Sequence, residues 1–494
     1  MTEHLPVLPI VLTLIAAPVC LLLRHRLIAF TFALAVVWNA FALAVTLLWT
    51  VLDDGTLSYH LGGWAPPWGI EYRVDVLGAF VVALVSGIGA VVLTYAPKSV
   101  AREVPEEKHY LFYTAYLLCV TGLMGIAITG DLFNVFVFLE ISSLSSYALI
   151  SLGPQRRSLT AAFRYLVLGT IGATFVLIAI GLLYMMTGTL NMADMAERLP
   201  QVAGKGRTIL VAAGFLSVGI CLKMALFPLH AWLPNAYAFA PSVVTAFLAA
   251  TATKVSVYVL VRFIFTIFRR VETYSGSRLA LALMVMSLVA IFVCSATAIY
   301  QRNIKRMLAW SSLAQIGYMV LGVSFLSVTG LTAGIVHLVN HAVTKGGLFL
   351  AMGCIALRLG SVELDDMRGL GRRMPLTMFL WVLGGLSLVG VPVTAGFISK
   401  WYLIGAALEK GWWPIAVMIL ISSLLALVYV WRVVEVAYFK SPKEGAEPLR
   451  EAPLGMLVPT CLLIGAAIWF GLSTSLTADV ARQAAEKLLG ASGR

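Results

Sequence analysis

Charged residues are scarce in this sequence. Of its 494 residues only 12% are Asp, Glu, Lys or Arg, whereas 60% are hydrophobic. Soluble domains carry charge on roughly a quarter of their residues, and a mean hydropathy of +0.93 lies far from that composition. The sequence therefore excludes an ordinary water-soluble protein. It predicts an all-α protein in a lipid bilayer, where each helix satisfies its own backbone hydrogen bonds.

The motifs of soluble chemistry are also missing. The chain has no Rossmann glycine fingerprint, no Fe–S cysteine spacing, no haem ligand pair, and neither HExxH nor GxSxG. Its cysteines stand singly in apolar segments, without histidines at metal-ligand spacing, which is typical of buried apolar residues. They are Cys20, Cys119, Cys221, Cys294, Cys354 and Cys461. We therefore expect a chain that is not an enzyme and holds neither a cofactor nor a metal ion.

Positive charge exceeds negative charge, and the formal net charge is +12. Lys and Arg gather in short loops, such as Arg24-His25-Arg26 and Arg372-Arg373, which is typical of loops beside lipid headgroups and gives no reason to expect a nucleic-acid partner. With the N-terminus outside, the inner loops carry more Lys and Arg than the outer loops, which favours that orientation. The first apolar segment has no positive n-region before it and no small-residue cleavage site after it, so we expect a retained spanning helix.

Apolar windows long enough to cross a bilayer recur along the whole chain. A spanning helix needs about 20 apolar residues, and we count fourteen candidate spans separated by charges, Gly or Pro. They run over 5–23, 27–51, 74–95, 110–129, 132–152, 159–186, 208–238, 242–266, 279–300, 304–325, 329–357, 375–408, 412–440 and 454–475. The connections between them are too short to fold as separate soluble domains.

Spans 7 and 12 are overlong and interrupted. Span 7 breaks at Phe227-Pro228 and Leu233-Pro234, and span 12 breaks between Gly390 and Gly396. Because backbone groups freed within a membrane must be satisfied inside the protein or by water, these breaks predict an internal cavity. Two broken spans, five spans apart, are typical of inverted five-helix repeats, here spans 4–8 and 9–13.

The repeats divide the chain into four predicted parts. These are an N-terminal three-helix segment (1–109), a first five-helix repeat (110–266), a second five-helix repeat (279–440), and a C-terminal helix with a short amphipathic tail (441–494).

Seven ionisable side chains lie inside the predicted spans. Such a side chain costs about 2.5–3.5 kcal/mol at the centre of a spanning helix, so its retention indicates a use. The seven are Glu140 in span 5, Lys223 in span 7, Lys254 in span 8, His337, His341 and Lys345 in span 11, and Lys400 after the break in span 12. The three residues of span 11 step by four positions, which places them on one face of the helix.

A carboxylate beside a poorly solvated lysine can switch between two states. The two groups form an ion pair or, after proton exchange, two neutral groups, and moving the partner changes whether the lysine keeps its proton. Glu140 shares its helix face with Ser143 and Tyr147, so we predict a proton switch that needs no cofactor. Structural alternatives stay open: Glu140 as a structural ion pair, Lys400 snorkelling to the interface, and the histidines as satisfied core residues.

Five longer motifs between residues 70 and 440 carry a family resemblance. They are GDLFNVFVFLEISSLSSYAL, LKMALFPLHAWLPNAYAFAPSVVTAFLAATATKVSVYVLVR, NIKRMLAWSSLAQIGYM, HLVNHAVTKGGLFLAMG and GLGRRMPLTMFLWVLGGLSLVGVPVTAGFISKW. Together they resemble the antiporter-like, proton-pumping membrane subunits that respiratory complex I shares with Mrp-type multisubunit cation/proton antiporters. The DLFNVFVFLE segment and the chain length look most like the D-type subunits of Mrp-type Na⁺/H⁺ antiporters.

The resemblance implies a role for each ionisable residue. Glu140 would be the carboxylate of helix 5, Lys223 its partner on broken helix 7, and Lys254 the linking basic residue of helix 8, where some relatives have histidine. His337, His341 and Lys345 would form the central relay on helix 11, and Lys400 the terminal group on broken helix 12. Some relatives carry glutamate at that last position, so a lysine there argues against a complex I subunit of that type.

The resemblance also implies partners and a location. It implies a subunit of a bacterial cell-membrane antiporter, assembled with subunits of the Mrp A, B, C, E, F and G types and moving protons together with Na⁺. Because no group of carboxylates and backbone oxygens here suits Na⁺, Na⁺ coupling would involve the partner subunits. The alternatives are the similarly sized proton-pumping subunit of complex I or of a membrane-bound hydrogenase, and a subunit that only scaffolds redox partners.

Overall fold

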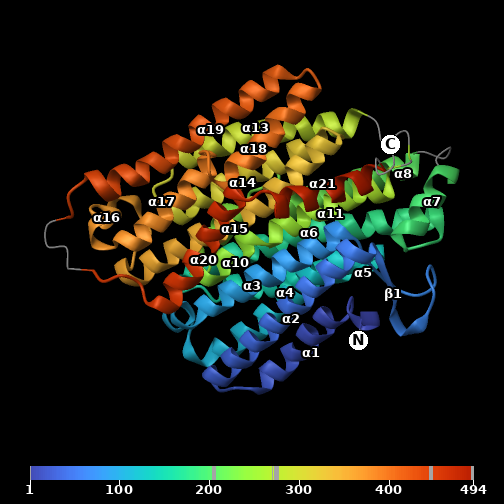
Figure 1. The fold of residues 1–494 in the computed structure, drawn as a ribbon. Coiled ribbons are helices and arrows are strands. Elements are labelled where there is room, and N and C mark those ends of the chain that lie inside the picture. Colours follow the sequence, from blue (N-terminus) through green and yellow to red (C-terminus); the bar gives the residue numbers. More distant parts are fainter. Residues whose placement is uncertain (1, 203–206, 270, 272–276, 444–448, 491–494) are drawn as a thin grey trace.

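The chain folds into a bundle of membrane-spanning helices, as shown by a computed structural model that describes residues 2–202, 207–269, 271, 277–443 and 449–490 (Figure 1). Among these residues, twelve helices are long and apolar enough to cross a membrane. The shorter α1 (Leu8–Leu22) and the pair α17 (Pro375–Val389) and α18 (Ala395–Glu409) account for the other two predicted spans. The predicted all-α polytopic fold, with broken helices 7 and 12, is therefore confirmed.

The first half of the bundle follows the predicted order closely. Its helices are α1, α2 (Arg26–Asp54), α3 (Val76–Glu103), α4 (His109–Ile128), α5 (Leu132–Ser151), α6 (Arg156–Thr187), the short α7 (Met192–Val202), α8 (Arg207–Met224), α9 (Leu233–Phe239), α10 (Ser242–Ala250) and α11 (Ala252–Arg262), which continues as a π-helical turn, η5 (Phe263–Ile267). Span 7 thus consists of α8 and α9, and span 8 of α10, α11 and η5.

The second half contains the remaining spans. Its helices are α13 (Ser277–Ile299), α14 (Ile304–Ser324), α15 (Val328–Leu359), the one-turn α16 (Leu370–Arg373), α17, α18, α19 (Trp413–Val434) with a π-helical turn, η7 (Glu435–Phe439), α20 (Leu454–Leu472) and α21 (Ser475–Leu489). The C-terminal tail is helical as far as Leu489, and α21 packs against α15 and α3 through a buried face that includes Ala481 and Ala485. Residues 444–448 and 491–494 of the predicted C-terminal part lie outside the described residues.

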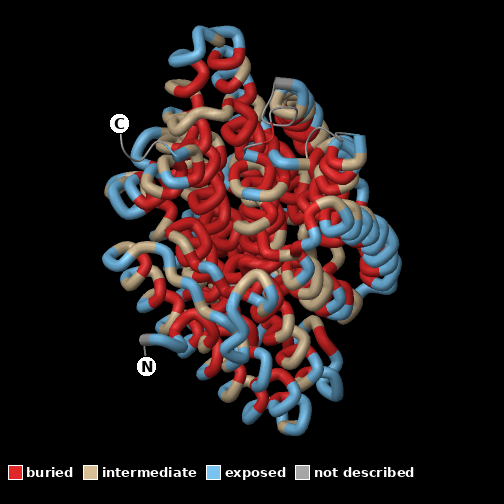
Figure 2. The backbone as a smooth tube through the Cα atoms, turned by 90° about the vertical axis from the view of Figure 1, so that its right-hand side faces the viewer, coloured by how far each residue is buried: buried red, intermediate tan, exposed pale blue. Residues whose placement is uncertain are grey.

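Burial separates central helices from peripheral helices. The helices α10, α11, α14 and α15 are buried over nearly their whole length, whereas α2, α13 and α19 expose most of their apolar surface. Figure 2 shows this arrangement as a buried centre surrounded by helices that are exposed along one side. Because a peripheral helix faces lipid, its exposed leucines and valines need no protein partner. Of the residues singled out above, the central helix α11 carries Lys254, and α15 carries His337, His341 and Lys345.

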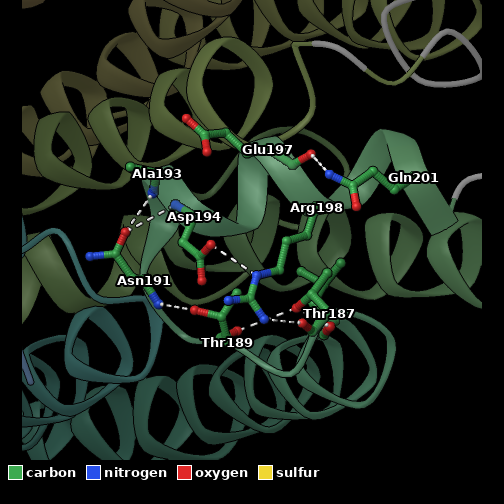
Figure 3. A network of polar contacts seen from close by, with 9 residues as sticks. Thr187, Thr189, Asn191, Ala193, Asp194, Glu197, Arg198 and Gln201 are labelled. Carbon is green, nitrogen blue, oxygen red and sulfur yellow. Dashed lines mark hydrogen bonds and ion pairs between the residues drawn. The ribbon is translucent and has the colours of Figure 1, made fainter. Parts of the chain in front are cut away.

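Two short connections have structure that the apolar windows did not predict. The loop between α2 and α3 forms an antiparallel hairpin of β1 (Leu57–His60) and β2 (Glu71–Val74). The loop between α6 and α8 forms α7, whose first turn is capped by Asn191: its side-chain oxygen accepts hydrogen bonds from the backbone N–H groups of Ala193 and Asp194. Within α7, Arg198 donates to Asp194 at 2.8 Å, and it also donates to the carbonyl of Thr187 at the end of α6 at 3.1 Å (Figure 3).

Replacing Asn191 by alanine is expected to destabilise this end of the bundle. The side chain caps α7, and its Nδ2 also donates to the carboxylate of Glu71 on β2 at 2.7 Å. Loss of an N-cap costs about 1 kcal/mol, and Glu71, which is buried, loses one of its two side-chain partners. A thermal melt of the purified complex should show a lower Tm for Asn191→Ala, while Asn191→Asp should retain the cap but repel Glu71. A Tm unchanged in Asn191→Ala would contradict this assignment.

Span 8 is not the continuous helix that its apolar window predicts. The helix ends at Ala250 and restarts at Ala252, because Thr251 adopts φ −123° and ψ −57°. The hydroxyl of Thr251 donates to the carbonyl of Phe247 at 2.7 Å, and the same carbonyl also accepts the backbone N–H of Thr251 at 3.0 Å. Three spans are therefore interrupted near the middle of the bundle: 7, 8 and 12.

Candidate functional site

Lys223 and Glu140 form an ion pair inside the bundle. The ammonium group of Lys223, in the last turn of α8, lies 3.1 Å from Oε1 of Glu140 on α5 and donates to Oγ of Ser143 at 2.7 Å. The side chain of Lys223 is 3% exposed and that of Glu140 is 24% exposed. The two predicted partners are thus brought together, and Ser143, one turn beyond Glu140, completes the contact.

The break after α8 is stabilised by aromatic side chains. Ala225 has a positive φ of 60°, which ends the helix two residues after Lys223. Trp232 donates its indole N–H to the freed carbonyl of Leu222 at 2.9 Å and stacks on Tyr165 of α6 with ring centroids 3.8 Å apart. The tryptophan therefore replaces a helical hydrogen bond, as a buried backbone group in a membrane requires.

Lys254 occupies the interruption of span 8. Its side chain lies on α11 and is 1% exposed. The ammonium group donates to the carbonyl of Ala249, at the end of α10, and to the hydroxyl of Thr253 at 3.3 Å. Because α10 stops at Ala250, the carbonyl of Ala249 is free to accept this hydrogen bond.

The three residues of span 11 lie along one buried face of α15. The rings of His337 and His341 are nearly parallel, 3° apart in orientation, with centroids separated by 6.0 Å. Nδ1 of His337 lies 2.8 Å from the hydroxyl of Ser399 on α18, whereas neither ring nitrogen of His341 has a hydrogen-bond partner among the described residues. Lys345 donates to the carbonyl of Leu308 at 2.9 Å and to the hydroxyl of Ser311, both on α14.

Lys400 reaches back into the break of span 12. Its ammonium group donates to the carbonyls of Leu388 and Val389 at 3.2 and 2.8 Å, and to the hydroxyl of Ser423 on α19 at 2.9 Å. It also lies 5.2 Å from the centre of the Tyr318 ring on α14. The side chain is 5% exposed and points into the bundle, so the alternative that Lys400 snorkels to the interface is not what the structure shows.

Two of the four lysines share one local design. The ammonium groups of Lys254 and Lys400 donate to carbonyls at the carboxyl ends of α10 and α17, whereas that of Lys223, in the last turn of α8, pairs with Glu140. The carboxyl end of a helix carries unpaired carbonyls and partial negative charge, which stabilises a cation without a full counter-charge. The interruptions after α10 and α17 therefore supply polar surroundings for a buried lysine, whereas Lys223 obtains them from Glu140 and Ser143 of α5.

Electrostatic contacts connect these groups into a line. Lys254 interacts with Lys345 and His341, and Lys400 interacts with His337. Between Lys223 and α11 lies a cavity of about 20 Å³, lined by Ser142, Ser143, Ser146 and Ser256 among others. A polar space of this size is large enough for about one water molecule. The arrangement can hold protons at basic groups on α8, α11, α15 and α18.

All seven predicted residues are therefore close to this line, and their partners include residues that the sequence did not indicate. Ser143 was expected beside Glu140. Ser311, Ser399, Ser423 and Tyr318 were not, because they come from other helices and no local spacing relates them to the lysines. The interruption at Thr251 was also missed, since it contains neither Gly nor Pro.

The fold and this line of groups define a polytopic helical membrane protein built around buried ionisable side chains. The family model described as "NADH:quinone oxidoreductase/Mrp antiporter, TM" matches residues 129–426, more than half of the chain, and the chain belongs to this family. Proteins of this kind are transporter subunits of membrane complexes and are not enzymes themselves.

Individual relatives fall into both branches of the family. The chain is 42% identical to "NADH-quinone oxidoreductase subunit N" of Desulforudis audaxviator (strain MP104C), over 96% of each chain. It is 29% identical to the D subunit of the Na(+)/H(+) antiporter of Bacillus subtilis (strain 168), over 98% of this chain and 97% of the relative. Among solved structures, a chain of the Mrp complex from Dietzia sp. DQ12-45-1b matches with a TM-score of 0.90 at 26% identity, covering 99% of this chain and 98% of that chain.

Proposed function

We propose that this chain is the proton-translocating, D-type subunit of a multisubunit cation/proton antiporter of the Mrp type. The observation that carries the proposal is the line of buried basic groups from the Glu140–Lys223 ion pair to Lys254 and Lys400, which donate to carbonyls at two helix interruptions. The antiporter relatives and the Mrp complex neighbour, which match nearly the whole chain, support it.

The proton route follows the order of the groups. A proton is first held by the Glu140–Lys223 pair, which exists as an ion pair or as two neutral groups. It passes through Lys254 to His341 and Lys345 and leaves by way of His337 and Lys400. Each transfer moves one proton between two nitrogen bases, so no cofactor is needed and total charge is conserved. Polar hydroxyls and water between the groups complete the path.

The partners and the orientation are part of the same proposal. We expect the other subunits of an Mrp-type complex, of the A, B, C, E, F and G types, in a bacterial inner membrane. The N-terminus would face outside, because the loops on the opposite side carry more Lys and Arg. Exchange of Na⁺ for protons would then be completed by the partner subunits.

A second candidate is the corresponding proton-pumping subunit of a respiratory complex I. The 42% identity to an NADH-quinone oxidoreductase subunit N favours it. The two candidates share the proton line and differ in the partners. Affinity purification of the tagged chain from its native membrane, followed by mass spectrometry, separates them: small antiporter subunits support the proposal, whereas flavin- and Fe–S-containing subunits would move the chain to the redox complex.

The substitution Glu140→Gln tests the proposal directly. Gln keeps the size and hydrogen-bonding capacity of the side chain but can neither pair as an anion with Lys223 nor bind a transferable proton. Cation-dependent proton exchange in everted membrane vesicles is expected to fall at least about 100-fold, the scale of a lost proton-transfer group. The control is Glu435→Gln, because Glu435 forms only an exposed ion pair with Lys440.

Assembly must be measured alongside transport. A native gel shows how much complete complex each variant forms. If Glu140→Gln forms the normal amount of complex and exchanges cations for protons at the normal rate, the proposed function is wrong. A loss of transport that only follows a loss of complex would instead support the scaffolding alternative.

A further inference from the structure

A second polar cavity opens on the face opposite to the two termini. It has a volume of about 480 Å³ and is lined by the ends of α3, α9 and α15, the starts of α6, α10 and α14, and the loops beside them. Six charged side chains line it: Arg102, Glu103, Arg157, Lys305, Arg306 and Glu363. None of these residues is among the seven ionisable residues, from Glu140 to Lys400, that form the proposed proton route.

Both acidic side chains in this cavity are already engaged. Glu103 accepts hydrogen bonds from the backbone N–H of Ser242 at 2.6 Å and from the hydroxyl of Ser99 at 3.0 Å. Glu363 accepts from the side-chain amide of Asn303 at 3.0 Å. These hydrogen bonds connect Glu103 and Glu363 to the cavity wall, and the basic side chains Arg102, Arg157, Lys305 and Arg306 line the same cavity.

Several polar atoms at the cavity are left without partners. Oγ of Ser242 and Nε of Arg306 are buried and have no hydrogen-bond partner among the described residues. Lys305 is 5% exposed, and its ammonium group has one long contact, 3.4 Å, to the carbonyl of Ala240. Because buried polar groups are normally satisfied, these atoms indicate that water enters the cavity and reaches Lys305.

Lys305 also lies close to the central relay. It is in the first turn of α14, three residues before Leu308 and six before Ser311, the two residues that hold the ammonium group of Lys345. At 1.5 Å per residue, these positions are about 4.5 and 9 Å further along the helix axis. The floor of the cavity is thus one to two helical turns from the residues that hold Lys345.

We propose that Lys305 is a proton-loading site, which exchanges protons between water in this cavity and Lys345 on the central relay. The proposal rests on the proposed function and adds to it an inlet from the face opposite to the termini. In the loading step a hydrated proton in the cavity gives its proton to the amine of Lys305, so an O–H bond breaks, an N–H bond forms and neutral water remains. In the next step that N–H bond breaks as an N–H bond forms on the amine of Lys345, and no other reactant is needed.

The charges around Lys305 suit exchange rather than permanent pairing. Glu103 on α3 lines the same cavity as Lys305 and brings a negative charge to it. Arg102 on α3, Arg157 on α6 and Arg306 on α14 also line the cavity and add positive charges, which repel a further cation. Glu363, bonded to Asn303, is the other acidic group at the cavity. Opposing influences of this kind allow a lysine to bind a proton and release it.

Chemical rescue of a cysteine variant tests the proposal. The variant Lys305→Cys is made in the complete complex, in a Cys461→Ser background, because Cys461 is the one native cysteine that is not fully buried. Cation/proton exchange is expected to fall at least about tenfold. In everted vesicles, 2-aminoethyl methanethiosulfonate should restore at least about half of the exchange, because it converts the cysteine into a lysine analogue with a titratable amine. The trimethylammonium reagent should not, because its charge is permanent.

The outcomes separate the inlet from the proposed function. Normal cation/proton exchange in Lys305→Cys, or equal rescue by both reagents, would show that Lys305 is not a proton-loading site. Neither result would affect the proposed function, which the Glu140→Gln variant tests separately. Lys108→Cys, an exposed position between α3 and α4, is the matched control and should be insensitive to both reagents. If Lys305→Cys does not assemble, Lys305→Arg is used: a guanidinium keeps the charge but not the exchangeable proton, so full exchange in that variant would also reject the inlet.

Discussion

Replacing Lys254 by methionine is expected to reduce cation/proton exchange to the level of vesicles without the complex. Lys254 lies between the Glu140–Lys223 pair and the groups on α15, and it interacts with both His341 and Lys345. Methionine has a similar length but binds no proton, so a proton that reaches Lys223 has no basic group to receive it on α11. The measurement is cation-dependent proton movement in everted vesicles, normalised to the amount of complex on a native gel.

If Lys254 had only a structural role, Lys254→Met would at most change stability and would not change transport. Lys254 is buried without a carboxylate partner, and its ammonium group contacts a carbonyl and a hydroxyl. Because burying an unpaired charge costs free energy, methionine should leave stability unchanged or raise it. Transport retained in Lys254→Met, with normal assembly, would contradict a linking role. Lys410→Met, at an exposed lysine that rests over the Trp412 ring, is the matched control.

Lys254→Arg refines the same test. Arginine keeps the positive charge and can still donate to the carbonyl of Ala249, but it does not release its proton in proteins. If the site only needs charge, Lys254→Arg should transport normally. If the site must pass a proton, the variant should assemble and remain inactive, which is the result we expect.

The fold could be predicted from the sequence wherever one physical rule acts alone. Apolar length is such a rule, because a bilayer fixes how many residues a spanning helix needs. It located the helices to within a few residues, and Pro and Gly located the breaks after Met224 and Val389. The division into four parts with their boundaries stays a prediction. No comparable rule finds the interruption at Thr251, where α10 stops between two threonine- and alanine-rich turns.

The site could be predicted in part, for a related reason. Membrane burial makes each ionisable side chain costly, so Glu140 and the lysines stand out in the sequence. The four-residue spacing of His337, His341 and Lys345 also placed them correctly on one face of α15. Their partners come from distant helices, as when Ser399 of α18 meets His337, and only packing decides such contacts. The roles of these residues in proton transfer remain predictions.

Removing Arg262 is expected to destabilise the protein strongly. Arg262, at the end of α11, donates through both Nη atoms to the carboxylate of Asp75 and through Nε to the hydroxyl of Tyr258 at 2.7 Å. The side chains are 11% and 21% exposed, so the pair is largely removed from water. Loss of one partner from a buried pair leaves an uncompensated charge, and Arg262→Met should cost about 3 kcal/mol. A thermal melt of the complex should show a clearly lower Tm.

A second variant distinguishes the uncompensated charge from a loss of packing. In Asp75→Asn/Arg262→Met no charge is left unpaired, and asparagine can still accept from the N–H of Gly78 and cap α3. The double variant should therefore be more stable than Arg262→Met alone. If the double variant is as unstable as Arg262→Met, the lost stability comes mainly from packing of the guanidinium against Tyr258 and not from the unpaired charge.

The pH dependence of the same pair has a defined sign. Burial raises the pKa of Asp75, but the Arg262 guanidinium outweighs that effect and holds the pKa below its ordinary value. A lowered folded-state pKa contributes stability that is present above the ordinary carboxyl pKa, about 3.9, and is lost as the pH falls through the lowered value. In Arg262→Met burial is opposed only by the hydrogen bond from the N–H of Gly78 and the charge of Arg73, so protonation of Asp75 relieves the charge that has lost its partner. The Tm difference between the two proteins should therefore narrow below about pH 4, and a difference that stays constant would show that the ion pair does not supply the stability.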